Sequence, residues 1–128
     1  MGGFDGIACA EYVDLYLIHA PHPGKRLESW KALETLKQLG KAKSIGVSNY
    51  GVHHLEELLE VATVPPAVNQ IEMHPFLVRH ELVVWCEHHD IQIEGYSPLA
   101  KAHRLDDPDL VEIARRFVLV FALCMYSW

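Results

Sequence analysis

The run YVDLYLIHAPHP at residues 12–23 determines the fold class that the sequence predicts. Its branched and leucine-rich centre is typical of a buried parallel strand, which is apolar on both faces. Pro21 and Pro23 lack a backbone donor and cannot extend the strand, so His19 should lie at its carboxyl end. Parallel sheets of α/β proteins place their chemistry at this end. We therefore expect the order of strand, polar tip and helix to recur along the chain.

Downstream of these prolines the sequence alternates between helical and extended patterns. Leucines and Trp30 recur at helical spacing over residues 27–39, and Gly40 is a typical helix stop. The remaining pattern predicts strands at residues 44–49, 67–73 and 91–97, and helices at 55–62, 81–89 and from Pro108 onward. Strand starts lie roughly 23 to 31 residues apart, the length of a strand plus a returning helix. The sequence thus predicts an α/β fold with a parallel sheet of about four βα units, a partial (β/α)₈ TIM barrel.

Composition indicates one globular domain in a reducing compartment. The chain has 128 residues, 50% of them hydrophobic and 22% charged, with a formal net charge of −6. The sequence contains no basic block, which argues against nucleic acid or an anionic membrane as a partner. Cys9, Cys86 and Cys124 form neither an even set nor a C-x-x-C pair, so no disulfide framework is expected. The N-terminus lacks the features of a secretory signal, and we expect a cytoplasmic protein.

Single polar residues mark the ends of the predicted strands. They are His19, Ser48, Asn49, Asn69, Gln70, Glu72, Tyr96 and Ser97. No G-x-G-x-x-G or G-x-x-x-x-G-K-[ST] loop follows the first strand, and side chains collected from several strand ends are typical of a barrel site. The runs DLYLIHAP, KSIGVSNY, AVNQIEMHP and GYSPLA, in this order and spacing, closely resemble the central part of the aldo-keto reductase family.

The resemblance covers residues 12–117 and implies a (β/α)₈ barrel that binds NADPH and reduces an aldehyde or ketone to an alcohol. It implies that His19 orients and polarises the carbonyl of a small-molecule substrate. The cofactor-binding residues that it implies are Ser48, Asn49 and Gln70 at the nicotinamide carboxamide, Tyr96 stacked on the nicotinamide ring, and Ser97 and Leu99 at the start of the pyrophosphate contacts.

Both ends of the chain depart from the family's pattern. The family's catalytic aspartate, tyrosine and lysine lie on segments before the strand at Tyr12, and the divergent residues 1–11 carry no match to them. Residues 118–128 form a divergent tail, and the apolar run that begins at Phe117 is too short to span a bilayer, which takes about 20 residues. General acid catalysis contributes on the order of 10² to 10⁴ in rate, so we expect this chain to be weakly active or inactive.

Three interpretations stay open at the level of the sequence. The chain is a partial domain of an NADPH-dependent aldo-keto reductase-like oxidoreductase, or a non-catalytic half-barrel that binds nucleotide or forms a homodimer through unpaired sheet edges. The third is a truncated or mis-spliced gene product that does not fold stably. The physiological substrate, the choice of NADP over NAD and the oligomeric state are not determined by these residues.

The nine histidines include two adjacent pairs, His53 with His54 and His88 with His89. Neighbouring residues on a helix point about 100° apart, so neither pair can chelate a metal as an i, i+4 pair would. We expect these histidines to be solvated helix positions, and we expect no metal site.

Overall fold

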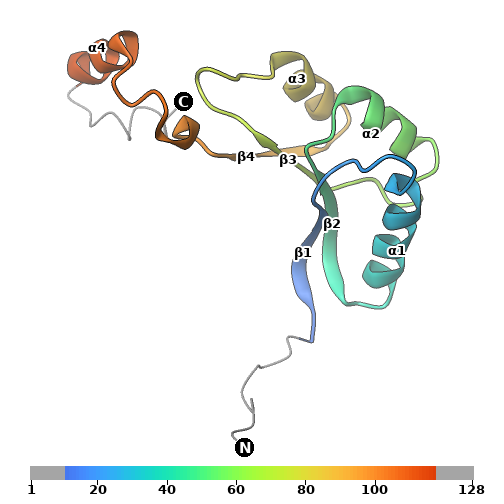
Figure 1. The fold of residues 1–128 in the computed structure, drawn as a ribbon. Coiled ribbons are helices and arrows are strands. Elements are labelled where there is room, and N and C mark those ends of the chain that lie inside the picture. The colour runs from blue at the N-terminus through green and yellow to red at the C-terminus, as the bar shows by residue number, and fades with distance from the viewer. Residues whose placement is uncertain (1–10, 118–128) are drawn as a thin grey trace, which may run out of the picture.

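The computed structural model of the protein describes residues 11–117. They form a parallel sheet whose strand order, β1-β2-β3-β4, follows the chain (Figure 1). The strands are β1 (Val13–Ile18), β2 (Ala42–Ser48), β3 (Val68–Glu72) and β4 (Gln92–Tyr96). The helices are α1 (Arg26–Gln38), α2 (Val52–Leu59), α3 (His80–His88) and α4 (Pro108–Arg116), with a 3₁₀ turn, η1, at Ala100–Ala102. The prediction of a partial α/β barrel of about four βα units is confirmed.

The register of the sheet brings the polar strand ends together. Ser48 on β2 pairs with Gln70 on β3, and Glu72 on β3 pairs with Tyr96 on β4. Ile18, the last residue of β1, pairs with Val47 of β2. All four strands run in the same direction, so their carboxyl ends and the loops that follow lie at one edge of the sheet.

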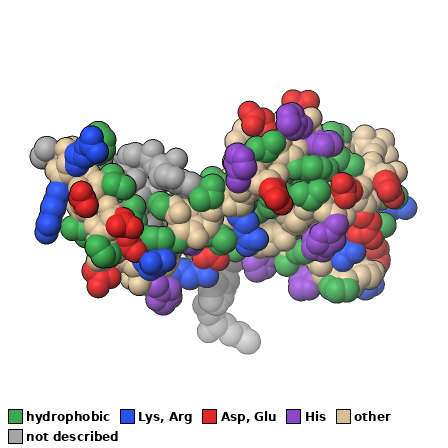
Figure 2. Space-filling view, turned by 90° about the horizontal axis from the view of Figure 1, so that it is seen from above, with side chains coloured by type: hydrophobic (Ala, Val, Ile, Leu, Met, Phe, Trp, Pro, Cys, Tyr) green, Lys and Arg blue, Asp and Glu red, His purple; other side chains and the backbone are tan. Residues whose placement is uncertain are grey.

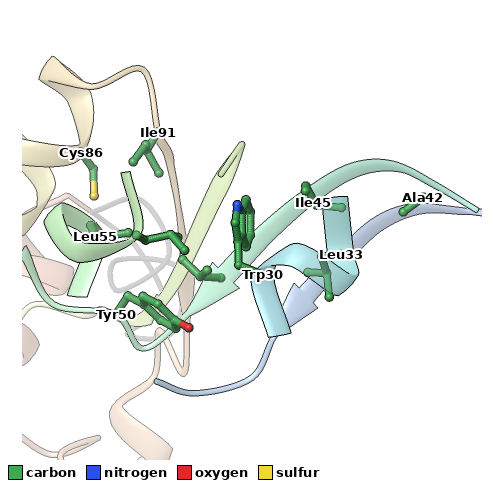
Figure 3. Packing of buried hydrophobic residues seen from close by; sticks show 10 residues of the cluster. Trp30, Leu33, Ala42, Ile45, Tyr50, Leu55, Cys86 and Ile91 are labelled. Atoms are coloured by element: carbon green, nitrogen blue, oxygen red, sulfur yellow. The ribbon is translucent and has the colours of Figure 1, made fainter. Parts of the chain in front are cut away.

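The main core lies between the sheet and the three helices α1, α2 and α3, which cover the same side of it (Figure 1). Figure 3 shows its buried side chains in a continuous row that runs from Leu33 through Trp30 to Cys86. Trp30 is fully buried and donates from Nε1 to the Val64 carbonyl at 3.2 Å. Of the leucines and Trp30 that recur at helical spacing on α1, Trp30 and Leu33 are buried in this core and Leu27 packs against it.

The end of α1 follows the glycine signal in the sequence. Gly40 has a left-handed φ of 70°, the Gly40 N–H donates to the Lys37 carbonyl, and the Lys41 N–H donates to the Leu36 carbonyl. This pair of bonds is the Schellman arrangement that ends many helices. Leu39, the last leucine of the helical pattern, lies just beyond the end of the helix. It is 67% exposed because the helix ends at Gln38, one residue before it.

The prediction that β1 is buried on both faces is also wrong. Tyr12, Val13 and Tyr16 are 45%, 39% and 47% exposed, and only the end of the strand, at Leu17 and Ile18, is partly covered. β1 is an edge strand, paired with β2 alone among the described elements. An apolar run in the sequence indicates that a strand can be buried on both faces. The position of the strand in the sheet, central or at the edge, decides how much of its surface is actually buried.

α4 packs apart from the main core. Figure 1 shows it away from α1, α2 and α3, on the far side of the turn that follows β4. Its Leu110 forms a second small cluster with Ala100, against which Phe76 and Leu99 pack. Within residues 11–117, no helix is both long enough and apolar enough to cross a membrane.

The surface seen from above carries side chains of mixed charge (Figure 2). Acidic, basic and histidine side chains lie close to one another over this face, without a continuous basic area.

Candidate functional site

Asn49 joins the loops that follow β1 and β2. It comes directly after β2 and has a left-handed φ of 61°, a conformation that asparagine tolerates better than most residues. Its Nδ2 donates to the His19 carbonyl at 2.9 Å and to Ser48 Oγ at 3.0 Å. Its backbone N–H donates to the Gln70 carbonyl at 2.8 Å. The asparagine is thereby fixed to the strands on both sides of β2.

Tyr96, at the end of β4, reaches across β3 to the same asparagine. Its hydroxyl donates to Asn49 Oδ1 at 2.8 Å. Ser48 Oγ donates to the Gln70 carbonyl at 2.8 Å, and Gln70 Nε2 donates to Glu94 Oε1 at 3.0 Å. The structure thus brings Ser48, Asn49, Gln70 and Tyr96, predicted from separate segments of the sequence, into one hydrogen-bonded group. We call these four residues the Asn49 group.

His19 lies at the rim of this group with an exposed side chain. Its carbonyl oxygen, and not its imidazole, makes the bond to Asn49. Within residues 11–117 the imidazole makes no hydrogen bond, so it remains available to a ligand at the carboxyl end of β1.

The turn after β4 places Ser97 and Leu99 differently. Ser97 has a left-handed φ of 53°, and its carbonyl accepts a hydrogen bond from the Ala100 N–H at 2.9 Å. Leu99 packs on the second cluster, next to Ala100. Lys101 pairs with Glu72 at 3.2 Å and fastens this turn to the end of β3. No hydrogen bond among the described residues links Ser97 or Leu99 to the Asn49 group, and their phosphate contacts stay a prediction.

Asn69 is a residue of this region to which the sequence assigned no role. It is fully buried, its Nδ2 donates to the Tyr50 carbonyl at 3.0 Å, and its Oδ1 accepts from the Tyr50 N–H at 3.4 Å. The signal that could have found it is strand alternation: Asn69 and Gln70 are adjacent, so only one of them can face the site.

The histidine prediction is wrong for one residue of the first pair. His53 is exposed, but His54 is half-buried and its Nδ1 accepts the Gly51 N–H at 3.2 Å, closing the first turn of α2. Burial, followed by the neighbouring His53 and Arg26, lowers the pKa of His54. In the second pair, His89 is exposed and stacks on Trp85 with 3.7 Å between ring centroids. Among residues 11–117, no three metal-binding side chains converge.

A groove of about 900 Å³ lies at the opposite end of the sheet, between the end of α1 and the loop after α2. Two of its lining lysines are engaged by the protein: Lys43 pairs with Asp14 at 2.7 Å, and Lys37 donates to the Lys43 carbonyl. It contains none of the strand-end residues, and its size alone does not make it the functional site.

Comparison with protein-family models matches residues 9–110 to the aldo/keto reductase family. The chain belongs to the aldo/keto reductase family. Among curated proteins it is 46% identical over 118 residues to the uncharacterized oxidoreductase YtbE of Bacillus subtilis, covering 92% of this chain and 42% of that protein. It is equally identical, over 118 residues, to a glyoxal reductase of the same organism, covering 92% of this chain and 43% of the relative.

Solved structures of aldo/keto reductases have the same fold. One from Brucella melitensis matches with a TM-score of 0.85 and 43% identity, over 92% of this chain and 46% of that one. A mutant of Gox0644 in complex with NADPH matches with a TM-score of 0.80 and 42% identity, over 87% of this chain and 42% of that one. The chain spans less than half the length of the relatives it matches.

A nicotinamide carboxamide offers one acceptor and two donors, and the Asn49 group carries polar side chains of the complementary kinds. Both hydrogens of Asn49 Nδ2 are engaged by His19 and Ser48, but Asn49 Oδ1, which accepts from Tyr96, has a second lone pair. Gln70 uses one amide hydrogen on Glu94, and among the described residues its oxygen and second hydrogen are uncommitted. These residues therefore fit the cofactor that the family implies.

Proposed function

We propose that the Asn49 group is the nicotinamide-binding part of an NADPH-dependent aldo/keto reductase that reduces a small aldehyde or ketone to an alcohol. The observation that supports this most is the chain of hydrogen bonds from Tyr96 through Asn49 to Ser48 and Gln70. Groups fixed before a ligand arrives need no reorganisation when it binds. The names of a glyoxal reductase and of an NADPH complex among the relatives support the carbonyl substrate and the cofactor. A reducing, cytoplasmic setting, in which Cys86 stays a thiol, belongs to the same proposal.

Each residue has its own role in the proposal. NADPH supplies the hydride when it is bound. Asn49 and Gln70 orient the carboxamide, Tyr96 presents its ring to the nicotinamide, and residues 97–99 begin the phosphate contacts. His19 donates a hydrogen bond to the substrate carbonyl, on whose oxygen negative charge develops as hydride arrives.

The 128 residues should bind NADPH better than they turn over substrate. None of them matches the family's tyrosine, which donates the proton, or the aspartate and lysine that support it. Loss of a general acid lowers a rate by on the order of 10² to 10⁴, and His19 can polarise the carbonyl without replacing the lost proton donor.

The binding step is tested by titrating the protein with NADPH and following the fluorescence of the reduced nicotinamide. Wild type should bind saturably, and Gln70→Leu should bind on the order of tenfold more weakly because it leaves the carboxamide unpaired. Gln92→Leu is the matched control, since Gln92 is an exposed glutamine at the first position of β4, at the other end of the sheet from the Asn49 group. Absence of saturable binding by wild type would overturn the proposal.

The reduction step is tested by following NADPH consumption with an aromatic aldehyde. We expect little turnover from wild type, and the same from His19→Ala. The control His22→Ala changes an exposed histidine of the same loop. Turnover that depends on His19 and not on His22 would contradict the expected inactivity and would mean that another group in this chain donates the proton.

A second candidate is a non-catalytic half-barrel that binds nucleotide or forms a homodimer. The exposed apolar side chains of β1 favour it, because they lie on an edge strand that lacks a second neighbour among the described elements. It shares the Asn49 group with the first candidate and differs from it in oligomeric state, since little turnover is expected of these 128 residues in either case.

A further inference from the structure

Asn69 carries a fully buried polar side chain on the core side of β3. Its register partner on β2 is Val47, a residue of the main core. Gln70, the next residue, points to the opposite face, so the Asn69 amide cannot touch a ligand that Gln70 binds. A buried amide must find hydrogen bonds inside the protein, and those of Asn69 go to the backbone of Tyr50.

The backbone groups of Tyr50 on both sides of its Cα are fixed by Asn69. Nδ2 donates to the Tyr50 carbonyl at 3.0 Å, and Oδ1 accepts the Tyr50 N–H at the longer distance of 3.4 Å. The Tyr50 hydroxyl is buried and has no hydrogen-bond partner within residues 11–117. The polar anchoring of Tyr50 therefore comes from its backbone and not from its side chain.

The Tyr50 N–H belongs to the peptide unit that joins Asn49 to Tyr50. Fixing that unit fixes ψ of Asn49 and, with it, the direction of the Asn49 side chain. Asn49 has a φ of 61°, in the left-handed region that residues other than glycine occupy uncommonly, although asparagine tolerates it better than most. The Asn49 N–H bond to the Gln70 carbonyl fixes one side of this residue, and Asn69 fixes the other.

We propose that Asn69 is a positioning residue of the nicotinamide site: it locks the peptide after Asn49 and so holds the Asn49 amide where it meets Tyr96 and faces the carboxamide. This inference rests on the proposed function. Asn69 contacts no ligand itself; it lies on the core side of β3 and acts on the site through Asn49.

The test compares Asn69→Leu with Ile71→Val, a conservative change at a buried residue on the same face of β3. The probe is reduced nicotinamide mononucleotide, which contains the nicotinamide half of the cofactor alone, titrated by fluorescence. Urea unfolding of each variant establishes that the variant is folded under the conditions of the titration. Asn69→Leu should bind the probe on the order of tenfold more weakly, as expected for a misplaced hydrogen-bonding group, and Ile71→Val should bind it as wild type does. Equal affinities of Asn69→Leu and wild type would overturn the inference.

A readout without cofactor separates this inference from the proposed function. In NMR spectra, Asn69→Leu should shift the side-chain amide resonances of Asn49 and speed the hydrogen exchange of the Tyr50 amide. If wild type binds no probe, the proposed function fails and these spectra still decide whether Asn69 positions Asn49. Unchanged Asn49 resonances would overturn the inference. Should Asn69→Leu not fold, Asn69→Ser, whose shorter hydroxyl cannot reach both groups of Tyr50, replaces it.

Discussion

Tyr96 connects two strands that do not touch, since β3 lies between β4 and β2. Tyr96→Phe keeps the ring and removes the hydroxyl that orients Asn49. Because a hydrogen bond of this kind contributes about 1 kcal/mol, we expect NADPH affinity to fall roughly fivefold in a fluorescence titration. Tyr16→Phe, at an exposed tyrosine of β1, is the control and should bind NADPH as wild type does. Full affinity in Tyr96→Phe would show that the hydroxyl does not orient the site.

His54 makes the stability of the fold depend on pH. Its Nδ1 accepts the Gly51 N–H only when unprotonated, and burial lowers its pKa in the folded state. Below the ordinary histidine pKa of about 6.5 the unfolded chain binds the proton more readily, so the free energy of unfolding should decrease as pH falls from about 7 to about 5.

Substitution isolates the contribution of His54 from those of the other histidines. His54→Gln keeps an acceptor at the third helical position and loses the titration, so its stability should vary less with pH than that of wild type. His53→Gln removes only the neighbour that contributes to the lowered pKa after burial, so it should weaken the pH dependence less than His54→Gln does. Urea unfolding at several pH values measures both, and parallel curves for wild type and His54→Gln would contradict the assignment.

The sequence could nominate the Asn49 group because its members follow predicted strands, and parallel strands bring their ends together. It could not assign Asn69, because a shift of one residue in the predicted strand would exchange the faces of Asn69 and Gln70. Nor could it find His54, whose hydrogen bond depends on the backbone geometry at the start of α2. Roles that depend on backbone direction become visible only in three dimensions.

At the scale of elements, Glu34 on α1 links its helix to the loop before β3. Its Oε1 accepts the N–H groups of Thr63 and Val64 at 2.7 and 2.8 Å. Glu34→Ala leaves both donors without this partner, and we expect the free energy of unfolding to fall by about 1–3 kcal/mol in urea. The control, Glu28→Ala, removes an exposed partner of Lys25 on the same helix and should change stability by less than about 1 kcal/mol.

The element boundaries in the sequence were predictable to within a few residues because glycine and proline mark them. Gly40 ends α1 and Pro108 begins α4, each for the local reason that the sequence supplies. The exposure of β1 was not predictable in the same way. Hydrophobic periodicity is a property of one segment, whereas an edge position depends on which other segments pair with it.

For the whole molecule, the face of the sheet opposite α1, α2 and α3 is a candidate for self-association. On this face, β1 presents Val13 and Leu15, whose exposed fractions are 39% and 36%. We expect sedimentation velocity to show a dimer that forms with increasing concentration, and lysines at both positions to return the protein to a monomer. Leu39→Lys is the control, at a more exposed leucine outside the sheet. A compact wild-type monomer at every concentration would exclude the homodimer.

The placement of α4 shows where prediction from sequence stops at this scale. Its start at Pro108 and its apolar residues predicted a helix, and the helix is there. Which surface it covers depends on the turn after β4, where Ala100, Lys101 and Ala102 all have positive φ. That unusual run of backbone conformations directs the chain away from the main core. The residue types Ala, Lys and Ala do not predict positive φ values.

The agreement between strand order and chain order has a consequence for how the protein acquires its structure. Each strand pairs only with the strands before and after it in the sequence, one helix away. Each pairing therefore closes a loop of one βα unit, and none of the described strand pairs has to bring distant parts of the chain together. The sheet can therefore be extended one βα unit at a time as a chain leaves the ribosome, with every new strand finding its template already in place.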